Sequence, residues 1–116
     1  MIPGVDIVSM SRIKKALSKF GNAFADRILT PEEVTLYRER KDGIQFIAGR
    51  FAAKEAIYKA VGIPELTWQR VSVLPEGKRP VVWIDGRQRK DIQVSISHEK
   101  EFAIAFAIAD SRSNYE

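Results

Sequence analysis

The sequence predicts an α+β fold, in which an N-terminal strand and several helices precede an antiparallel β meander. Apolar residues follow helical spacing up to Gly62 and alternate with a period of two after it. The longest expected helix, residues 46–61, is apolar around its whole circumference, so we expect it to be buried and packed on the sheet. A chain of 116 residues has room for a single domain, 1–116.

The first strand is expected at residues 2–8, with an early interruption at Pro3-Gly4. A helix follows, and either Ser9 or Ser11 can cap its N-terminus. Helical spacing of its apolar residues predicts a buried stripe made of Ile13, Ala16, Leu17 and Phe20.

The segment that begins at Thr30 has the residues typical of a helix N-terminus. Thr30 can act as the N-cap, Pro31 suits the first helical position, and Glu33 completes a capping box. We expect this helix to close at Gly43 and the long helix to stop at Gly62, since glycine is the usual residue just beyond a helix C-terminus.

Alternating apolar residues predict strands at 71–74, 81–84 and 92–96, with a hairpin signal at Asp85-Gly86. The last strand, residues 102–108, is apolar on both faces, with large residues on one face and alanines on the other. It should therefore be a central strand that a helix approaches closely on the alanine side. The N-terminal strand is expected to join the same sheet.

Composition narrows the range of partners. The formal charge of +4 and pI of about 9.5 favour an anionic partner, which could be a nucleic acid, a nucleotide phosphate or an acidic protein. Without cysteine the chain has no disulfides or thiolate metal sites, which fits a reducing, cytoplasmic compartment. No apolar run is long enough for a membrane span and no signal peptide is visible, so no membrane association is expected.

Two acids stand in apolar settings. Glu55 lies on the predominantly apolar long helix, and Asp6 lies between apolar residues of the first strand. One interpretation is structural: Glu55 pairs with Lys59 one helical turn further on, and Asp6 either caps its strand or belongs to an edge strand. The other is that both acids hold a magnesium ion, so that Arg50, Lys54 and Lys59 become phosphate ligands.

His98 is the only histidine, so a metal site with several histidines cannot form within one chain. It lies where a strand meets its hairpin loop, either as an exposed turn residue or as a ligand of a phosphate or sugar. A nucleic-acid-binding module would need aromatic and basic residues interleaved on a surface. Because Phe102 and Phe106 fall at core spacing, a nucleic-acid partner is disfavoured.

Four blocks occur in order along the chain: Gly4-Val5-Asp6-Ile7-Val8 with Arg12-Ile13, Arg27-Ile28-Leu29-Thr30-Pro31-Glu32-Glu33, Gly49-Arg50-Phe51-Ala52-Ala53-Lys54-Glu55-Ala56 with Lys59-Ala60-Val61-Gly62, and Val94-Ser95-Ile96-Ser97-His98. Together they resemble the holo-acyl-carrier-protein synthases, a family within the 4′-phosphopantetheinyl transferase superfamily. The segment Gly62-Ile63-Pro64-Glu65-Leu66 departs from the family pattern, because it is short and lacks a Thr-Gly pair common there.

The resemblance implies an enzyme of fatty acid biosynthesis with the phosphopantetheinyl transferase fold. It would transfer 4′-phosphopantetheine from coenzyme A to a serine of apo acyl-carrier protein and release adenosine 3′,5′-bisphosphate. Asp6 and Glu55 match the family's magnesium ligands, and Glu55 is the candidate base, acting directly or through a metal-bound water. Lys59 matches a lysine beside the coenzyme A phosphates. A family member turned noncatalytic is disfavoured, because these three residues are present.

Further residues match the family's binding positions. Cofactor binding is implied for Arg50, Ser97 and His98, and carrier-protein contact for Arg12. We extend the docking face of the first helix to Lys14 and Lys15, although these charges could also form only a solvated basic face. The resemblance also implies a homotrimer with coenzyme A bound between subunits.

Overall fold

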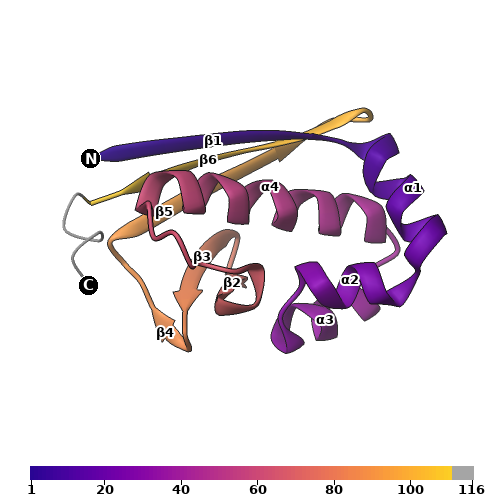
Figure 1. Ribbon diagram of the computed structural model, residues 1–116, viewed down its shortest axis with the longest axis horizontal. Helices are drawn as coiled ribbons and strands as arrows, with labels where there is room; N and C mark the ends of the chain where they lie inside the picture. Colours follow the sequence, from indigo (N-terminus) through magenta and orange to yellow (C-terminus); the bar gives the residue numbers. More distant parts are fainter. Residues whose placement is uncertain (111–116) are drawn as a thin grey trace.

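The computed structural model describes residues 1–110 and confirms the α+β class (Figure 1). Its elements are β1 (Ile2–Ser9), α1 (Met10–Phe20), α2 (Asn22–Ile28), α3 (Pro31–Arg38), α4 (Gly43–Val61), the short 3-10 helix η1 (Trp68–Arg70), β2 (Val71–Glu76), β3 (Arg79–Ile84), β4 (Arg87–Gln88), β5 (Ile92–His98) and β6 (Phe102–Ala109). Within this described part, no helix has the length and apolar character needed to cross a membrane.

The strands form two antiparallel sheets, ordered β1-β6-β5 and β2-β3-β4. The expected central position of β6, between β1 and β5, is confirmed. The expectation of one sheet containing all strands is wrong. Figure 1 shows α4 running along the first sheet, with the second sheet on another side of the helix. A helix that is apolar on every side needs cover on more than one side, which a single sheet cannot supply.

β1 is one unbroken strand, so the predicted interruption at Pro3-Gly4 is wrong. Pro3 is tolerated because β1 lies at the edge of its sheet. Gly4 faces α4, where an added Cβ would collide with the carbonyl oxygen of Ala56 and lie 2.8 Å from the backbone nitrogen of Ala60. Gly4 and the buried alanines of β6 therefore let the helix backbone approach the sheet closely.

Replacing Gly4 by alanine is expected to lower the free energy of unfolding by about 1–3 kcal/mol, because the sheet and α4 must move apart. Urea denaturation of the purified variant measures this. Val5→Ala is the matched control, since Val5 is 51% exposed on the opposite face of the same strand. Equal stability of the Gly4 variant and wild type would show that the close approach is not needed.

The predicted helix boundaries hold at two positions and shift at one. Thr30 and Glu33 form the expected capping box, and Gly62 ends α4 in the left-handed conformation, with φ 73°. However, α3 ends at Arg38, and α4 already begins at Gly43. Gly43 lies against the Tyr37 ring, where a Cβ would be 2.9 Å from the nearest ring carbon, so it helps the chain turn between the helices.

The outer face of the first sheet is exposed. Its large apolar residues are 41% to 61% exposed: Val5, Ile7, Phe102, Ile104 and Phe106. The expectation that Phe102 and Phe106 belong to the core is wrong, because within residues 1–110 no element covers this face. Phe20 is also exposed, contrary to expectation, since it lies at the end of α1 beneath the Lys19 ammonium group.

Candidate active site

Lys59 reaches from α4 to β1. Its Nζ lies 3.2 Å from Asp6 Oδ1 and donates a 2.9 Å hydrogen bond to the Val5 carbonyl oxygen. Of the two interpretations offered by the sequence, the structural one paired Lys59 with Glu55, but the ion pair that Lys59 forms is with Asp6 on another element. The Asp6 side chain is 19% exposed, which makes it a partly desolvated carboxylate facing the helix.

Glu55 is half-buried one turn before Lys59. Burial raises the pKa of Glu55 above its ordinary value, and the negative charge of Asp6 raises it further. Lys59 and a hydrogen bond with the Trp68 side chain act in the opposite direction on that pKa. The two acids thus share one neighbourhood, as the magnesium interpretation of the sequence requires. A hollow of about 310 Å³ beside Glu55 is walled by the short segment that follows α4.

This pair of acids suits magnesium by its chemistry. Mg²⁺ usually binds one or two carboxylates and completes its coordination shell with water and substrate phosphate. Among residues 1–110 there is no cluster of three metal-binding side chains, so the protein would supply only the two carboxylates of Asp6 and Glu55. The Lys59 ammonium group beside Asp6 indicates that a cation is stable at this position.

A separate cavity of about 900 Å³ contains Arg50 and His98. His98 Nε2 is 2.8 Å from Gln45 Nε2, which places the ring against the start of α4. The cavity is strongly basic, and the cationic residues that line it beside Arg50 are Arg40, Lys78, Arg79, Arg89 and Lys90. Asp42 is the single acid among the described lining residues. Such a cavity favours a ligand with several negative charges.

Arg50 is held in place on two sides. Its Nε donates a 3.1 Å hydrogen bond to the Val73 carbonyl oxygen, and its guanidinium group lies 4.3 Å from the centre of the Phe46 ring. Burial lowers the pKa of Arg50, and the nearby Glu33 carboxylate opposes that shift. Arginine nevertheless stays cationic in proteins. The structure thus presents a fixed positive charge to the cavity.

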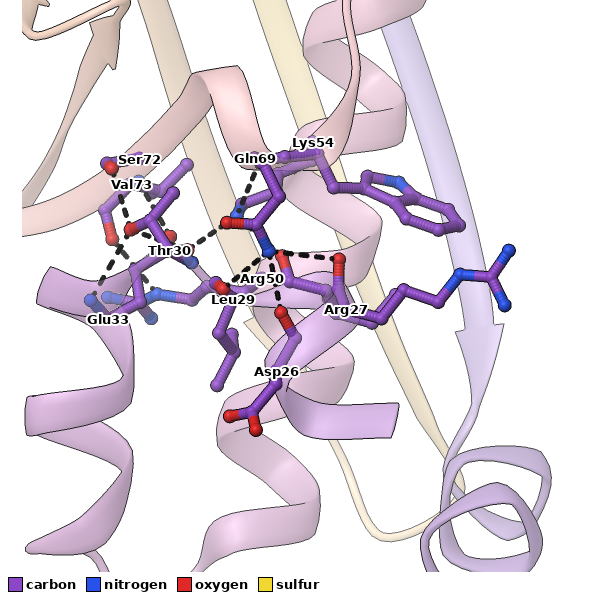
Figure 2. A network of polar contacts seen from close by, with 12 residues as sticks. Asp26, Arg27, Leu29, Thr30, Glu33, Arg50, Lys54, Gln69, Ser72 and Val73 are labelled. Atoms are coloured by element: carbon purple, nitrogen blue, oxygen red, sulfur yellow. Dashed lines mark hydrogen bonds and ion pairs between the residues drawn. The ribbon is translucent and has the colours of Figure 1, made fainter. Parts of the chain in front are cut away.

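The predicted phosphate role of Lys54 is wrong. Lys54 is buried and ion-paired with Glu33, and its Nζ also donates to the carbonyl oxygens of Ile28 (2.7 Å) and Trp68 (3.2 Å), as Figure 2 shows in part. Burial lowers the pKa of Lys54, while the charge and the hydrogen bond of the Glu33 carboxylate act to raise it. A lysine enclosed in this way has no access to a ligand.

The remaining predicted residues are spread over the surface. Arg12, Lys14 and Lys15 are all exposed on α1, as expected. Ser97 pairs with Ile104 and lies on the outer face of the first sheet, so the structure does not place it in the basic cavity with His98. The cavity lysines and arginines were missed in the sequence, although basic pairs such as Lys78-Arg79 and Arg89-Lys90 marked the turns that carry them.

One chain does not bring the acids and the basic cavity together. Arg50 and Glu55 are five residues apart on α4, which places them about 140° apart around the helix axis. None of the described residues lining the cavity is Asp6, Glu55 or Lys59. Each half of the predicted site is present, on different faces of the same helix.

Fold and site together define a protein suited to a phosphorylated ligand. The chain belongs to the 4′-phosphopantetheinyl transferase superfamily, which it matches over residues 3–107. It is 44% identical over 113 residues to a holo-[acyl-carrier-protein] synthase of Chlorobium limicola, with 90% of each chain covered. The family resemblance of the sequence motifs is thereby confirmed.

Two solved structures share the fold. The crystal structure of holo-[acyl-carrier-protein] synthase from Neisseria meningitidis superposes with a TM-score of 0.85 at 35% identity, covering 96% of this chain and 100% of that one. The Bacillus anthracis holo-(acyl-carrier-protein) synthase, solved in complex with CoA (3′,5′-ADP), gives a TM-score of 0.80 at 37% identity over 95% and 96% of the two chains.

Proposed function

We propose that this protein transfers 4′-phosphopantetheine from coenzyme A to a serine of apo acyl-carrier protein, as a single-domain enzyme of fatty acid biosynthesis. The observation that carries the proposal is the basic cavity around Arg50 and His98, in a chain whose structural relative binds CoA. Its lysines and arginines suit the nucleotide phosphates of coenzyme A. The sequence without cysteine is compatible with a cytoplasmic location.

The reaction forms a bond between the serine oxygen and the β-phosphorus of coenzyme A. The bond from that phosphorus to the bridging oxygen breaks, and adenosine 3′,5′-bisphosphate leaves with the electron pair. Glu55 accepts the serine proton, directly or through a metal-bound water, and its half-buried position near Asp6 supports this role. Lys59 then moves from Asp6 to the diphosphate, whose growing charge it neutralises.

Asp6 and Glu55 would hold a magnesium ion. When bound, Mg²⁺ would supply positive charge to the diphosphate as the leaving group departs. The test is to remove divalent cations with EDTA and to follow release of adenosine 3′,5′-bisphosphate. Release should stop and return when magnesium is added in excess. Undiminished release in EDTA would contradict a metal role for the two acids.

The complete site is built between copies of this chain, in a homotrimer. Two observations support this assembly: the acids and the basic cavity lie on different faces of α4, and the first sheet has an exposed apolar outer face. Large exposed apolar patches mark interaction surfaces, and a closed ring of identical copies buries the same patch in each.

Co-expression of Glu55→Gln and Arg50→Ala chains is expected to restore activity that neither variant has alone. If each site takes Glu55 from one copy and Arg50 from the next, about one site in four of randomly mixed trimers has both intact residues. Transfer assays on the purified mixture, with each single variant as the control, measure this. Mixtures as inactive as the single variants would place both residues in the same copy.

The basic face of α1 is proposed to dock the carrier protein. Arg12, Lys14 and Lys15 are all exposed on α1, and acidic residues are absent from its first turn. A cationic surface of this kind steers an acidic partner toward the enzyme.

Reversing Arg12 and Lys14 to glutamate should raise the KM for the carrier protein by about tenfold or more and flatten its salt dependence, because steering acts within a Debye length of about 8 Å at physiological salt. Steady-state kinetics at several salt concentrations test this, and coenzyme A affinity should not change. Arg38→Glu with Arg87→Glu is the control, since it changes the net charge equally on other exposed elements. Unaltered carrier kinetics in the α1 variant would move docking to a different surface.

A further inference from the structure

The buried pair of Glu33 and Lys54 is connected to Arg50 through a single residue, Val73 (Figure 2). The Glu33 side chain is fully buried and uses both carboxylate oxygens. Oε1 accepts from the Thr30 backbone nitrogen at 2.9 Å and pairs with Lys54, while Oε2 accepts from the Val73 backbone nitrogen at 2.8 Å. The Val73 carbonyl oxygen in turn accepts from Arg50 Nε.

We propose that Glu33 is a positioning residue for coenzyme A binding, which acts by fixing the backbone of Val73 so that its carbonyl oxygen orients the Arg50 guanidinium group. Val73 occupies the Nε donor, so the two terminal nitrogens remain for a ligand, without a protein partner among residues 1–110. Arg50 lines the basic cavity, and its guanidinium group lies over the Phe46 ring. This inference rests on the proposed function, which assigns Arg50 to the nucleotide phosphates.

Position 33 requires a carboxylate side chain. Four donors from three residues, Thr30, Lys54 and Val73, converge on Glu33, and an ionised carboxylate accepts at both oxygens. Glutamine has nearly the same shape but replaces one oxygen with an amino group. If its oxygen stays with Thr30 and Lys54, the amino group faces the Val73 N–H, donor against donor. The Val73 peptide then loses its anchor, and the Arg50 side chain loses its orientation.

A purely structural role for Glu33 predicts a different outcome from a positioning role. General loosening of the core would weaken coenzyme A binding whether or not Arg50 is present. A role that acts through Arg50 would have no further effect once the guanidinium group is removed. A double-mutant cycle separates these two cases.

The experiment measures the Kd of coenzyme A by calorimetry for wild type, Glu33→Gln, Arg50→Ala and the double variant. Glu33→Gln should raise the Kd by about tenfold or more, since small displacements of a positioning group have large effects. In the Arg50→Ala background the same change should have no effect. Val61→Ala, at a buried position of α4 eleven residues beyond Arg50, controls for lowered thermal stability. Wild-type affinity in Glu33→Gln, or equal losses in both backgrounds, would overturn the proposal.

If Glu33→Gln does not fold, the variant Glu33→Gln/Lys54→Met is used in the cycle instead. It replaces the buried ion pair with a neutral pair. A second readout does not depend on coenzyme A. Proton exchange of Arg50 Nε–H, followed by NMR, should be slow in wild type and fast in the Glu33 variant, because the bond to Val73 is lost. Unchanged exchange would overturn the inference. A wild-type protein that binds no coenzyme A would instead contradict the proposed function and leave the exchange result to decide the role of Glu33.

Discussion

Replacing Glu55 by glutamine is expected to lower kcat for phosphopantetheinyl transfer by about 10²- to 10⁴-fold, the usual effect of removing a general base. Glutamine keeps the shape of the side chain but cannot accept the serine proton. It also halves the charge that Asp6 and Glu55 offer a metal ion. The fold should be unaffected, since Glu55 is only half-buried and the substitution removes its repulsion with Asp6.

Steady-state assays with saturating coenzyme A and carrier protein measure this effect, and circular dichroism checks the fold. Glu32→Gln is the matched control, because Glu32 is an exposed acid in the first turn of α3, away from both halves of the site. The control should keep wild-type kcat. A Glu55 variant with normal kcat would remove this residue from proton transfer.

Lys54→Met is expected to lower the free energy of unfolding by about 3–5 kcal/mol, because it leaves the Glu33 carboxylate buried without its cation. The lost ammonium group also leaves the Ile28 carbonyl oxygen without that donor. The effect should be much larger than for any exposed lysine.

Urea denaturation at neutral pH measures the loss. Arg70→Met is the comparison, since the ion pair between Arg70 and Asp85 is exposed to solvent and its loss should change little. Glu33→Gln/Lys54→Met should recover much of the stability, because no unpaired charge stays buried. A Lys54 variant as stable as the Arg70 variant would show that the buried pair does not support the fold.

Local sequence signals predicted the elements well. The capping box at Thr30, the glycine stop at Gly62 and the alternation in β6 depend on neighbours in the chain, and each is found as expected. The division into two sheets could not be read in this way, because strand pairing is decided by how α4 is covered on its several sides. The unbroken β1 likewise depends on its edge position, which the sequence does not state.

For the site as well, the sequence predicted local features but not how packing arranges them. Asp6 and Glu55 were recognised as acids in apolar settings, and the structure brings them near one another. Lys54 was grouped with Lys59 because both are cations of one helix, but only packing decides that Lys54 points inward to Glu33 and Lys59 outward to Asp6. The exposure of Phe106 could not be foreseen either, since a core face and an interaction face have the same apolar alternation.

The most direct test of the proposed transferase activity is mass spectrometry of apo acyl-carrier protein incubated with this protein, coenzyme A and magnesium. The carrier is expected to gain the mass of one phosphopantetheine on a single serine, with release of adenosine 3′,5′-bisphosphate, and a carrier with this serine changed to alanine is expected to gain none. No mass gain on any of several apo carrier proteins, under conditions in which coenzyme A binds, would contradict it.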